Sequence, residues 1–390
     1  MSQALNVDIV RTDKDLQPPL YAKRDIALVR GEGVYLWDAD GTRYLDLVSN
    51  YGVNILGHAH PKVTEAIQRQ AATLVSCHQS FANDVRSAFL QKLLSIAPAG
   101  LTHAFLSNSG TEAIEAALKF AYVATGRTKV VAAKRGYHGR TLGALAATAD
   151  KKHRDPFAGA LADATHVTYG DAEALAEAVD EATAAVVLEP IQGEGGIHPA
   201  PPGYLARARE IAHAAGALVI FDEIQTGFRT GTWFACQHAG VTPDLMALSK
   251  GLANGVPIGA TLMTAEVAGA LEGGVHGTTF GGNPLAAAAG LATLEALEAE
   301  GWLAHSAEVG AYFIAQLRSL AHPKIREVRG QGLMIGVELK SRATPVVRAM
   351  QERGVLALMA GSLTVRFLPP LLLTREQVDT AVSVFAEALG

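Results

Sequence analysis

The stretch that decides the fold is residues 217–255, which begin ALVIFDEIQTGF and end DLMALSKGLANG. The apolar run 218–221 stops at Asp222, as expected for a buried parallel strand with a carboxylate at its C-terminal end. A second apolar run, 245–248, leads to Lys250. Because ligands of open α/β sheets bind beyond the carboxyl ends of the strands, the two runs predict one crevice that holds Asp222 and Lys250.

Burial in this crevice would give Lys250 unusual chemistry. An ammonium group that loses its hydration has a lowered pKa, so the neutral amine becomes available to form an imine with an aldehyde. A lone Asp at a strand end more often caps a turn, and a lone Lys more often lies on the surface. A Walker B strand would read similarly, but that ATPase class needs Gly-Lys-Ser/Thr, and Gly-Lys occurs nowhere in the chain.

Composition indicates a globular protein and excludes several classes. The 390 residues are 49% hydrophobic and 18% charged, which suits two or three domains. A net charge of −5 argues against nucleic acid as a partner. No secretory signal or membrane-spanning run is visible, so we expect a cytoplasmic protein that binds no membrane. Cys77 and Cys236 suggest neither a disulfide framework nor a zinc site, and no metal is expected.

Periodicity predicts a mostly parallel sheet between two terminal regions. The segment 33–47 has the pattern of a hairpin, and a helix should begin near Pro61. From about residue 100, repeated strand–helix units indicate a mostly parallel sheet covered on both faces. Asn283 and Pro284 should begin a long Ala/Leu helix. Composition shifts near residue 300, and the tail resembles a smaller α+β unit.

A helix start downstream of residue 107 is a candidate phosphate site. Ser109 and Glu112 have the spacing of a capping box, and the backbone amides of Gly110 and Thr111 are left free at the positive end of the helix dipole. Loops after the next two predicted strands carry further polar groups. These are Tyr137, His138 and Arg140 in one loop and Glu194 in the other, beyond the strand that ends at Glu189. A cofactor with a phosphate, an aldehyde and a pyridine nitrogen, such as pyridoxal 5′-phosphate, would use all of these groups.

The sequence resembles the class III pyridoxal-phosphate aminotransferases of fold type I, in the acetylornithine/ornithine aminotransferase group, over nearly its whole length. The matching stretches are LGHAHP (56–61), SNSGTEAIEAALKFA (107–121), YHGRTLGAL (137–145), EPIQGEGG (189–196), FDEIQTGFRTG (221–231), LSKGLANGVPIGA (248–260), HGTTFGGNP (276–284) and VRFLPPL (365–371). The resemblance implies a large domain with a mostly parallel seven-stranded sheet, plus a smaller α+β domain made from both termini. The implied division is 1–55 for the arm and part of the small domain, 56–298 for the large domain and 299–390 for the C-terminal small domain.

The resemblance also implies how the cofactor is held. Lys250 would bind it covalently and then move the substrate proton, Asp222 would keep the pyridine nitrogen protonated, and Gln225 would approach the ring hydroxyl. Tyr137, with His138 beside it, would lie against the ring. The phosphate would be held by Ser109, Gly110 and Thr111, with Thr279 of the partner subunit completing an active site at the interface of an obligatory homodimer.

The substrate residues follow from the same resemblance. Arg140 would bind the distal carboxylate and Arg366 the α-carboxylate of glutamate, while Glu194 would neutralise Arg366 when an ω-amine is bound and swing aside for glutamate. The expected reaction is a ping-pong transamination between N-acetylornithine and 2-oxoglutarate, which gives N-acetylglutamate 5-semialdehyde and glutamate in arginine biosynthesis.

Other substrates and classes stay open at this point. Residues 360–370 also resemble the enzymes of lysine biosynthesis that act on α-aminoadipate semialdehyde linked to an amino-group carrier protein, and a basic rim at the site mouth would favour that substrate. Tyr51 departs from the acetylornithine pattern, which has an aliphatic residue there, and favours ornithine; 4-aminobutyrate is a further alternative. A non-catalytic regulator would not need both Lys250 and Asp222, and a racemase or aminomutase would not depend on 2-oxoglutarate.

Overall fold

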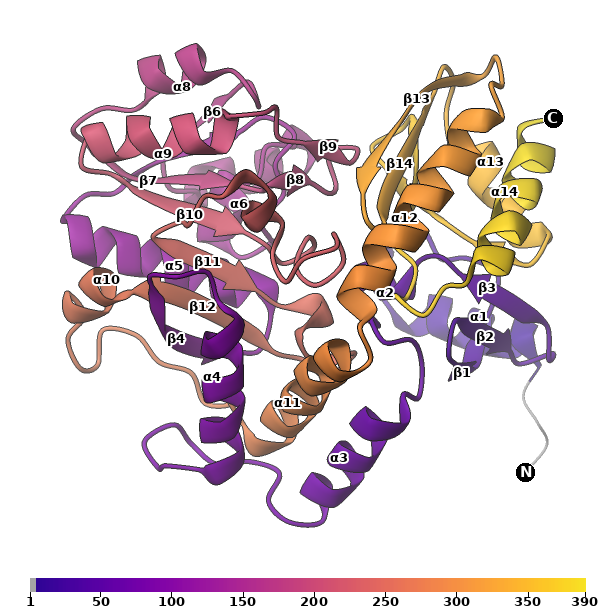
Figure 1. Ribbon diagram of the computed structural model, residues 1–390, viewed down its shortest axis with the longest axis horizontal. Coiled ribbons are helices and arrows are strands. Elements are labelled where there is room, and N and C mark those ends of the chain that lie inside the picture. The colour runs from indigo at the N-terminus through magenta and orange to yellow at the C-terminus, as the bar shows by residue number, and fades with distance from the viewer. Residues whose placement is uncertain (1–4) are drawn as a thin grey trace.

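The computed structural model describes residues 5–390, and its centre is a seven-stranded sheet with the order β4-β12-β11-β10-β7-β5-β6 (Figure 1). Its strands are β4 (Leu101–Ser107), β5 (Lys129–Ala133), β6 (Ala164–Val167), β7 (Thr183–Leu188), β10 (Leu218–Asp222), β11 (Leu245–Leu248) and β12 (Gly259–Thr264). Strand β12 runs antiparallel to both neighbours, whereas β10 pairs in parallel with β11 and β7, and β5 pairs in parallel with β7 and β6. The predicted mostly parallel seven-stranded sheet is confirmed.

Helices cover both faces of this sheet, as the unbroken apolar strands predict. In β5, Val130 and Ala132 belong to one buried cluster and Val131 and Ala133 to another, because successive side chains point to opposite faces. The first cluster includes the buried side of α5 (Gly110–Thr125). The second includes residues of α4 (Asp84–Ile96), α9 (Tyr204–Ala214) and α11 (Pro284–Ala299).

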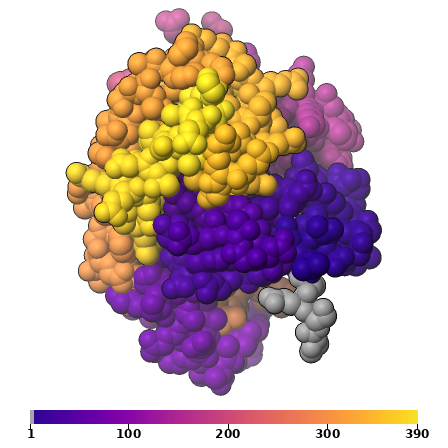
Figure 2. All heavy atoms as spheres, turned by 90° about the vertical axis from the view of Figure 1, so that its right-hand side faces the viewer, coloured from indigo at the N-terminus to yellow at the C-terminus, as the bar shows by residue number. Residues whose placement is uncertain are grey.

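Both ends of the chain build a second, smaller lobe. Strands β1 (Leu28–Glu32), β2 (Tyr35–Asp38) and β3 (Arg43–Asp46) form a sheet with β15 (Val355–Leu356) from the C-terminal region. A second four-stranded sheet has the order β13-β14-β17-β16. Its strands are β13 (Ile325–Gln331), β14 (Met334–Leu339), β16 (Leu358–Ala360) and β17 (Thr364–Phe367). Figure 2 shows the indigo N-terminal and yellow C-terminal regions side by side on this lobe. The expected α+β unit from both termini is therefore confirmed, while the exact boundaries 55/56 and 298/299 stay a prediction.

Several local predictions hold and others do not. The 33–47 segment forms the β2–β3 hairpin, α3 spans Pro61–Ala71, and Asn283 caps α11 with Pro284 in its first turn. The N-terminal arm contains α1 (Asn6–Leu16). The long helix α12 (Trp302–Ser319) was not predicted, because Gly301 supplies no side-chain cap and the buried positions include Ser306 and Gly310, which obscure the apolar period.

Helices α13 (Thr344–Glu352) and α14 (Arg375–Leu389) form where the tail pattern placed them, and they pack against each other beside β15. Shorter helices complete the large lobe: α6 (Leu142–Ala147), α7 (Lys151–Arg154), α8 (Ala172–Ala178) and α10 (Ala265–Gly269). Within residues 5–390, no helix combines the length and the apolar character needed to cross a bilayer.

Candidate active site

The C-terminal ends of β10 and β11 bring Asp222 and Lys250 to one cavity of about 230 Å³. The two strands pair in parallel, with Asp222 opposite Ala247, so the chain needs only three more residues to reach Lys250. Burial lowers the pKa of Lys250, and the nearby Glu194 carboxylate only partly opposes this effect. The amine is therefore closer to its neutral, nucleophilic form than a surface lysine would be.

Most of the predicted site residues meet at this cavity. Nine of them line it: Gly110, Thr111, Tyr137, His138, Arg140, Glu194, Asp222, Gln225 and Lys250. The lining also includes Gly139, Glu189, Ile224 and Ser249, which the predicted set does not contain. The other four predicted residues lie outside it. Ser109 caps α5, Arg366 lies behind Glu194, Tyr51 lies over Arg366, and Thr279 is exposed on the loop before α11.

The N-terminus of α5 offers backbone amides to the cavity. The Ser109 hydroxyl accepts a hydrogen bond from the Glu112 amide, while the Glu112 carboxylate accepts from the Asn108 amide at 2.8 Å and from the Ser109 hydroxyl at 3.0 Å. The predicted capping box therefore forms with one difference: the Glu112 carboxylate accepts the backbone amide of Asn108, not that of the capping residue Ser109. First-turn amides such as those of Gly110 and Thr111 have no intrahelical acceptor and can bind an anion.

Two glycines keep this end of the cavity open. A Cβ atom on Gly110 would lie 2.9 Å from Cδ1 of Ile224, and one on Gly139 would lie 2.2 Å from Oγ1 of Thr111. Any larger residue would push side chains into the space in front of the helix start. The cradle is thus shaped for a group that closely approaches the backbone.

His138 forms a buried hydrogen bond with Asp222. Its Nδ1 lies 2.7 Å from Oδ2 of Asp222, and both side chains are buried. Burial alone would lower the pKa of His138, but the hydrogen bond and the charge of Asp222 outweigh it and raise the pKa. Oδ1 of Asp222 accepts the Ile224 amide at 3.0 Å. The result is a carboxyl group that lines the cavity with both oxygens held in place, which suits a protonated ring nitrogen.

Glu189 is a site residue that sequence reasoning missed. It directly follows β7 and is only 6% exposed. One carboxylate oxygen accepts the amide of Tyr137 at 3.0 Å, and the other accepts the amide of Gly193 at 2.9 Å. Burial raises the pKa of Glu189 to about 7, with His138 opposing and Asp222 adding to the shift. Its signal in the sequence was the same strand-end position that identified Asp222.

Glu194 and Arg366 form a bidentate ion pair. The Arg366 guanidinium donates to both Glu194 carboxylate oxygens, at 2.6 and 3.1 Å, and Arg366 is fully buried on β17. Gln225 joins the pair, since its oxygen accepts from Arg366 at 3.0 Å and its amide donates to Glu194 at 3.2 Å. Burial tends to raise the pKa of Glu194, but the charge and hydrogen bonds of Arg366 lower it. Glu194 is therefore charged at neutral pH.

The segment that carries Arg140, which lines the cavity, is rich in basic residues. Arg140 is exposed, lies 5.9 Å from the Tyr137 ring centroid and has Nη2 3.2 Å from Nε2 of His153 on α7. Segment 134–155 contains six Lys or Arg and two Asp, in a chain whose net charge is −5. We call four exposed residues of this segment the basic rim: Arg135, Arg140, Lys151 and Lys152.

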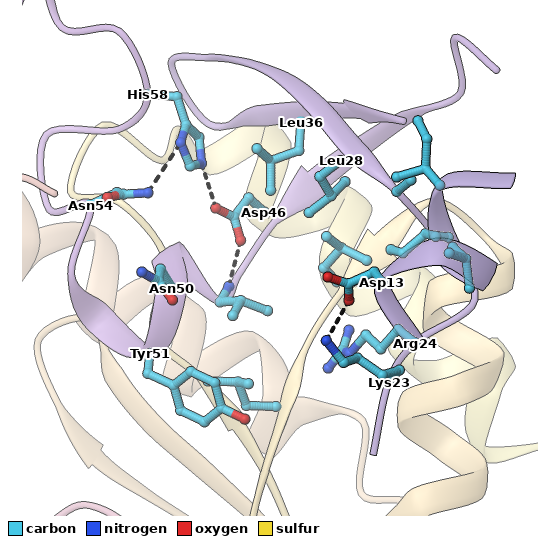
Figure 3. A pocket seen from close by; sticks show the side chains of 17 residues that line it. Asp13, Lys23, Arg24, Leu28, Leu36, Asp46, Asn50, Tyr51, Asn54 and His58 are labelled. Atoms are coloured by element: carbon cyan, nitrogen blue, oxygen red, sulfur yellow. Dashed lines mark hydrogen bonds and ion pairs between the residues drawn. The ribbon is translucent and has the colours of Figure 1, made fainter. Parts of the chain in front are cut away.

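Tyr51 borders a second, larger cavity of about 640 Å³ between α1 and the sheet β1-β2-β3-β15 (Figure 3). The guanidinium carbon of Arg366 lies 5.5 Å from the centroid of the Tyr51 ring, which is 49% exposed. Tyr51 thus lies between this cavity and the Glu194–Arg366 pair. Arg366 and Tyr51 therefore lie together at one corner of the site.

Comparisons with known proteins agree with this geometry. A family profile described as Aminotransferase class-III matches residues 19–389. The chain is 51% identical over 382 residues to the LysW-aminoadipate semialdehyde transaminase of Deinococcus radiodurans, covering 97% of this chain and 89% of that protein. It is 44% identical over 388 residues to the acetylornithine aminotransferase of Methanosarcina acetivorans, covering 99% and 97%. Among solved structures, an ornithine aminotransferase from Toxoplasma gondii, described with partial occupancy of PLP at its active site, matches with a TM-score of 0.95 and 34% identity, covering 99% of this chain and 94% of that one.

Proposed function

The chain belongs to the class III aminotransferases, and from this premise we propose that it exchanges an amino group between glutamate and a carrier-protein-linked α-aminoadipate semialdehyde, in lysine biosynthesis. The 51% identity to a transaminase named for that substrate supports this proposal over N-acetylornithine, because the acetylornithine aminotransferase of Methanosarcina acetivorans is 44% identical. The expectation of N-acetylornithine as the main substrate therefore moves to second place. The chain is a pyridoxal-phosphate-dependent aminotransferase in either case.

The cavity fits pyridoxal phosphate at three of its functional groups: the phosphate, the aldehyde and the ring nitrogen. The amides at the start of α5 and the space kept by Gly110 and Gly139 suit the phosphate, with Ser109 fixing the helix start. The Lys250 amine suits the aldehyde, and the Asp222 carboxyl group suits the ring nitrogen. The cofactor supplies a ring that draws electrons from the bond broken at the substrate carbon.

Each catalytic side chain then has a defined task. Asp222, hydrogen-bonded to His138, would keep a proton on the ring nitrogen. Lys250 anchors the cofactor and then takes and returns a proton at the substrate carbon, which its lowered pKa permits. Tyr137, whose backbone amide donates to Glu189, lines the cavity and would lie against the ring. Thr279 of the partner subunit completes the phosphate site in the homodimer that we propose.

Glu194 and Arg366 let one site accept two different substrates. Arg366 binds the α-carboxylate of glutamate or 2-oxoglutarate in place of Glu194. When the ω-amine substrate is present, it has no carboxylate at that position, and Glu194 returns to neutralise the buried guanidinium. Arg140 at the mouth binds the carboxylate farther from the reacting carbon, and Tyr51 bounds the same corner as Arg366.

The observation that carries the choice of a carrier-linked substrate is the basic rim. An N-acetyl group needs no extended contact surface at the mouth, whereas a carrier protein must dock there. Exposed cations on the segment that carries Arg140 attract a partner with an acidic surface and speed its association. Lys151 and Lys152 lie beside His153, which contacts Arg140, so a docked carrier would pass over them on its way to the cavity.

The test is a charge reversal on the rim. Lys151→Glu/Lys152→Glu should lower kcat/KM for the carrier-linked substrate by about tenfold or more at low salt, while kcat/KM for N-acetylornithine stays unchanged. Lys340→Glu/Arg342→Glu is the matched control, because both residues are exposed and lie on the other lobe after β14. If the rim variant leaves the carrier-linked reaction unaffected, or the enzyme uses only N-acetylornithine, the carrier proposal is wrong.

A further inference from the structure

Residues 49–52 adopt a left-handed turn that is sterically unfavourable for most of its members. The φ angles of Ser49, Asn50 and Tyr51 are 41°, 51° and 60°, and that of Gly52 is 87°. Successive non-glycine residues in this region are unusual, because Cβ crowds the following carbonyl oxygen. Such a turn persists only where its surroundings hold it, and such segments cluster at functional sites.

A buried Asp–His pair holds the start of the turn. Asp46 is fully buried, and its Oδ1 accepts the amides of Val48 at 2.8 Å and Ser49 at 2.9 Å. Its Oδ2 lies 2.7 Å from Nε2 of His58, whose Nδ1 lies 3.1 Å from the Asn54 amide (Figure 3). One carboxylate therefore joins the first residues of the turn to a histidine on the loop that follows it.

The His58 ring is itself confined. A Cβ atom on Gly31 would lie 2.6 Å from its Cγ, so β1 packs directly on the ring, and the backbone of His58 pairs with Gly33. The imidazole can therefore keep its Nε2 directed at Asp46.

Two contacts with distant parts of the chain secure the rest of the turn. The Ser49 hydroxyl donates to the Leu368 carbonyl at 2.6 Å, close to Arg366 in sequence. The fully buried Arg229 donates to the Gly52 carbonyl at 3.0 Å. The turn is thus fixed at both ends, and its exposed member, Tyr51, is placed with its ring 5.5 Å from the Arg366 guanidinium carbon.

We propose that Asp46 and His58 are positioning residues for substrate selection, which hold the left-handed turn so that Tyr51 faces the substrate end that meets Arg366. This inference rests on the proposed function, in which Tyr51 and Arg366 form the corner that receives that end. His58 and Asp46 touch neither substrate nor cofactor and act through Tyr51. A purely structural pair would stabilise the lobe without an effect that depends on Tyr51.

The test is a double-mutant cycle on the full-length holoenzyme, with the KM for the amino donor and kcat measured for N-acetylornithine and for the carrier-linked amine. The variants are His58→Leu, Tyr51→Ala and the two combined. His60→Leu is the matched control, because His60 is a buried histidine on the same loop that faces Glu300 at 3.4 Å and not the turn. His58→Gln is the conservative variant, because its amide nitrogen reaches the Nε2 position. Cofactor absorbance reports whether the pyridoxal phosphate site is intact.

We expect His58→Leu to raise the KM for the donor by roughly tenfold or more, with kcat and cofactor absorbance nearly unchanged. His58→Gln should restore most of the affinity, and His58→Leu should add nothing in the Tyr51→Ala background. If His58→Leu does not fold, Asn54→Ala, which removes only the outer hydrogen bond, replaces it in the cycle. The inference would be overturned if His58→Leu raised the KM for the donor only as much as His60→Leu does, or if the effects of His58→Leu and Tyr51→Ala on this KM were fully additive. If the wild-type enzyme showed no transamination of either substrate, the proposed function would be refuted instead.

Discussion

Replacing Glu194 with glutamine should change which substrate the enzyme prefers. The substitution keeps the size of the side chain but removes the charge that pairs with Arg366 through hydrogen bonds of 2.6 and 3.1 Å. Hydrogen bonds to charged groups contribute about 1.5–3 kcal/mol each, and the glutamine can still make one of them. The complex with an ω-amine therefore loses about 1.5–3 kcal/mol, whereas the complex with glutamate, whose carboxylate replaces Glu194, loses little.

This loss corresponds to a shift of roughly 10- to 100-fold in the ratio of kcat/KM for the ω-amine to kcat/KM for glutamate. Single-turnover rates of each half-reaction, followed by cofactor absorbance, measure the two values separately. Glu327→Gln is the matched control, because it removes a 2.7 Å ion pair from the buried Arg329, which keeps Glu338. An unchanged ratio in Glu194→Gln, or an equal shift in the control, would refute the idea that Glu194 responds to the substrate.

Four further predictions follow from the site. Arg366 lowers the pKa of Glu194 below its ordinary value despite burial. The preference for ω-amines should therefore be constant near neutral pH and decline only in acid, where Glu194 becomes protonated. Measuring kcat/KM for both substrates against pH tests this. The pKa of Glu189 is shifted in the opposite direction, upward to about 7 in the folded protein. At pH values between the unfolded pKa and about 7, the folded protein therefore binds one proton more than the unfolded chain, and the free energy of unfolding falls as pH rises. Between about pH 4 and about pH 8 the wild type should therefore lose up to about 3 kcal/mol of unfolding free energy relative to Glu189→Gln, in denaturant unfolding of the cofactor-free enzyme. Glutamine has only one acceptor oxygen for the two amides that Glu189 accepts, and the cost of the lost hydrogen bond is the same at both pH values. Asp222→Asn should keep the covalently bound cofactor but lower kcat by about 100-fold or more, because the ring nitrogen loses its anionic partner; cofactor absorbance and rate measured together test this. Gly139→Ala should weaken cofactor binding, since its Cβ would lie 2.2 Å from Oγ1 of Thr111, and equilibrium titration with pyridoxal phosphate should detect the loss.

The sequence predicted the site where local patterns determine it. Asp222 and Lys250 follow apolar strands, and parallel pairing brings the ends of neighbouring strands together regardless of the connection between them. The start of α5 was visible because a cap and a helix period lie in one short stretch. Glu189 lies at a strand end as Asp222 does, but the expected chemistry assigns roles only to Asp222 and Glu194, so the sequence did not single out Glu189 as a site residue.

Features that depend on distant contacts were not predictable in this way. The left-handed turn at Tyr51 has no glycine at its first three positions, and it is held by Arg229, 177 residues away from Gly52 in sequence. The bridge that Gln225 makes across Glu194 and Arg366 joins three separate segments. Positive φ at non-glycine residues and long-range hydrogen bonds arise from tertiary packing, which no local period reveals.

The most direct test of the account concerns one covalent bond. Reducing the purified enzyme with borohydride in the presence of pyridoxal phosphate, then digesting it and mapping the peptides by mass spectrometry, locates the lysine that carries the cofactor. A pyridoxyl group is expected on Lys250, which lines the cavity with Asp222. A pyridoxyl group on a different lysine, or no modified peptide at all, would contradict this expectation.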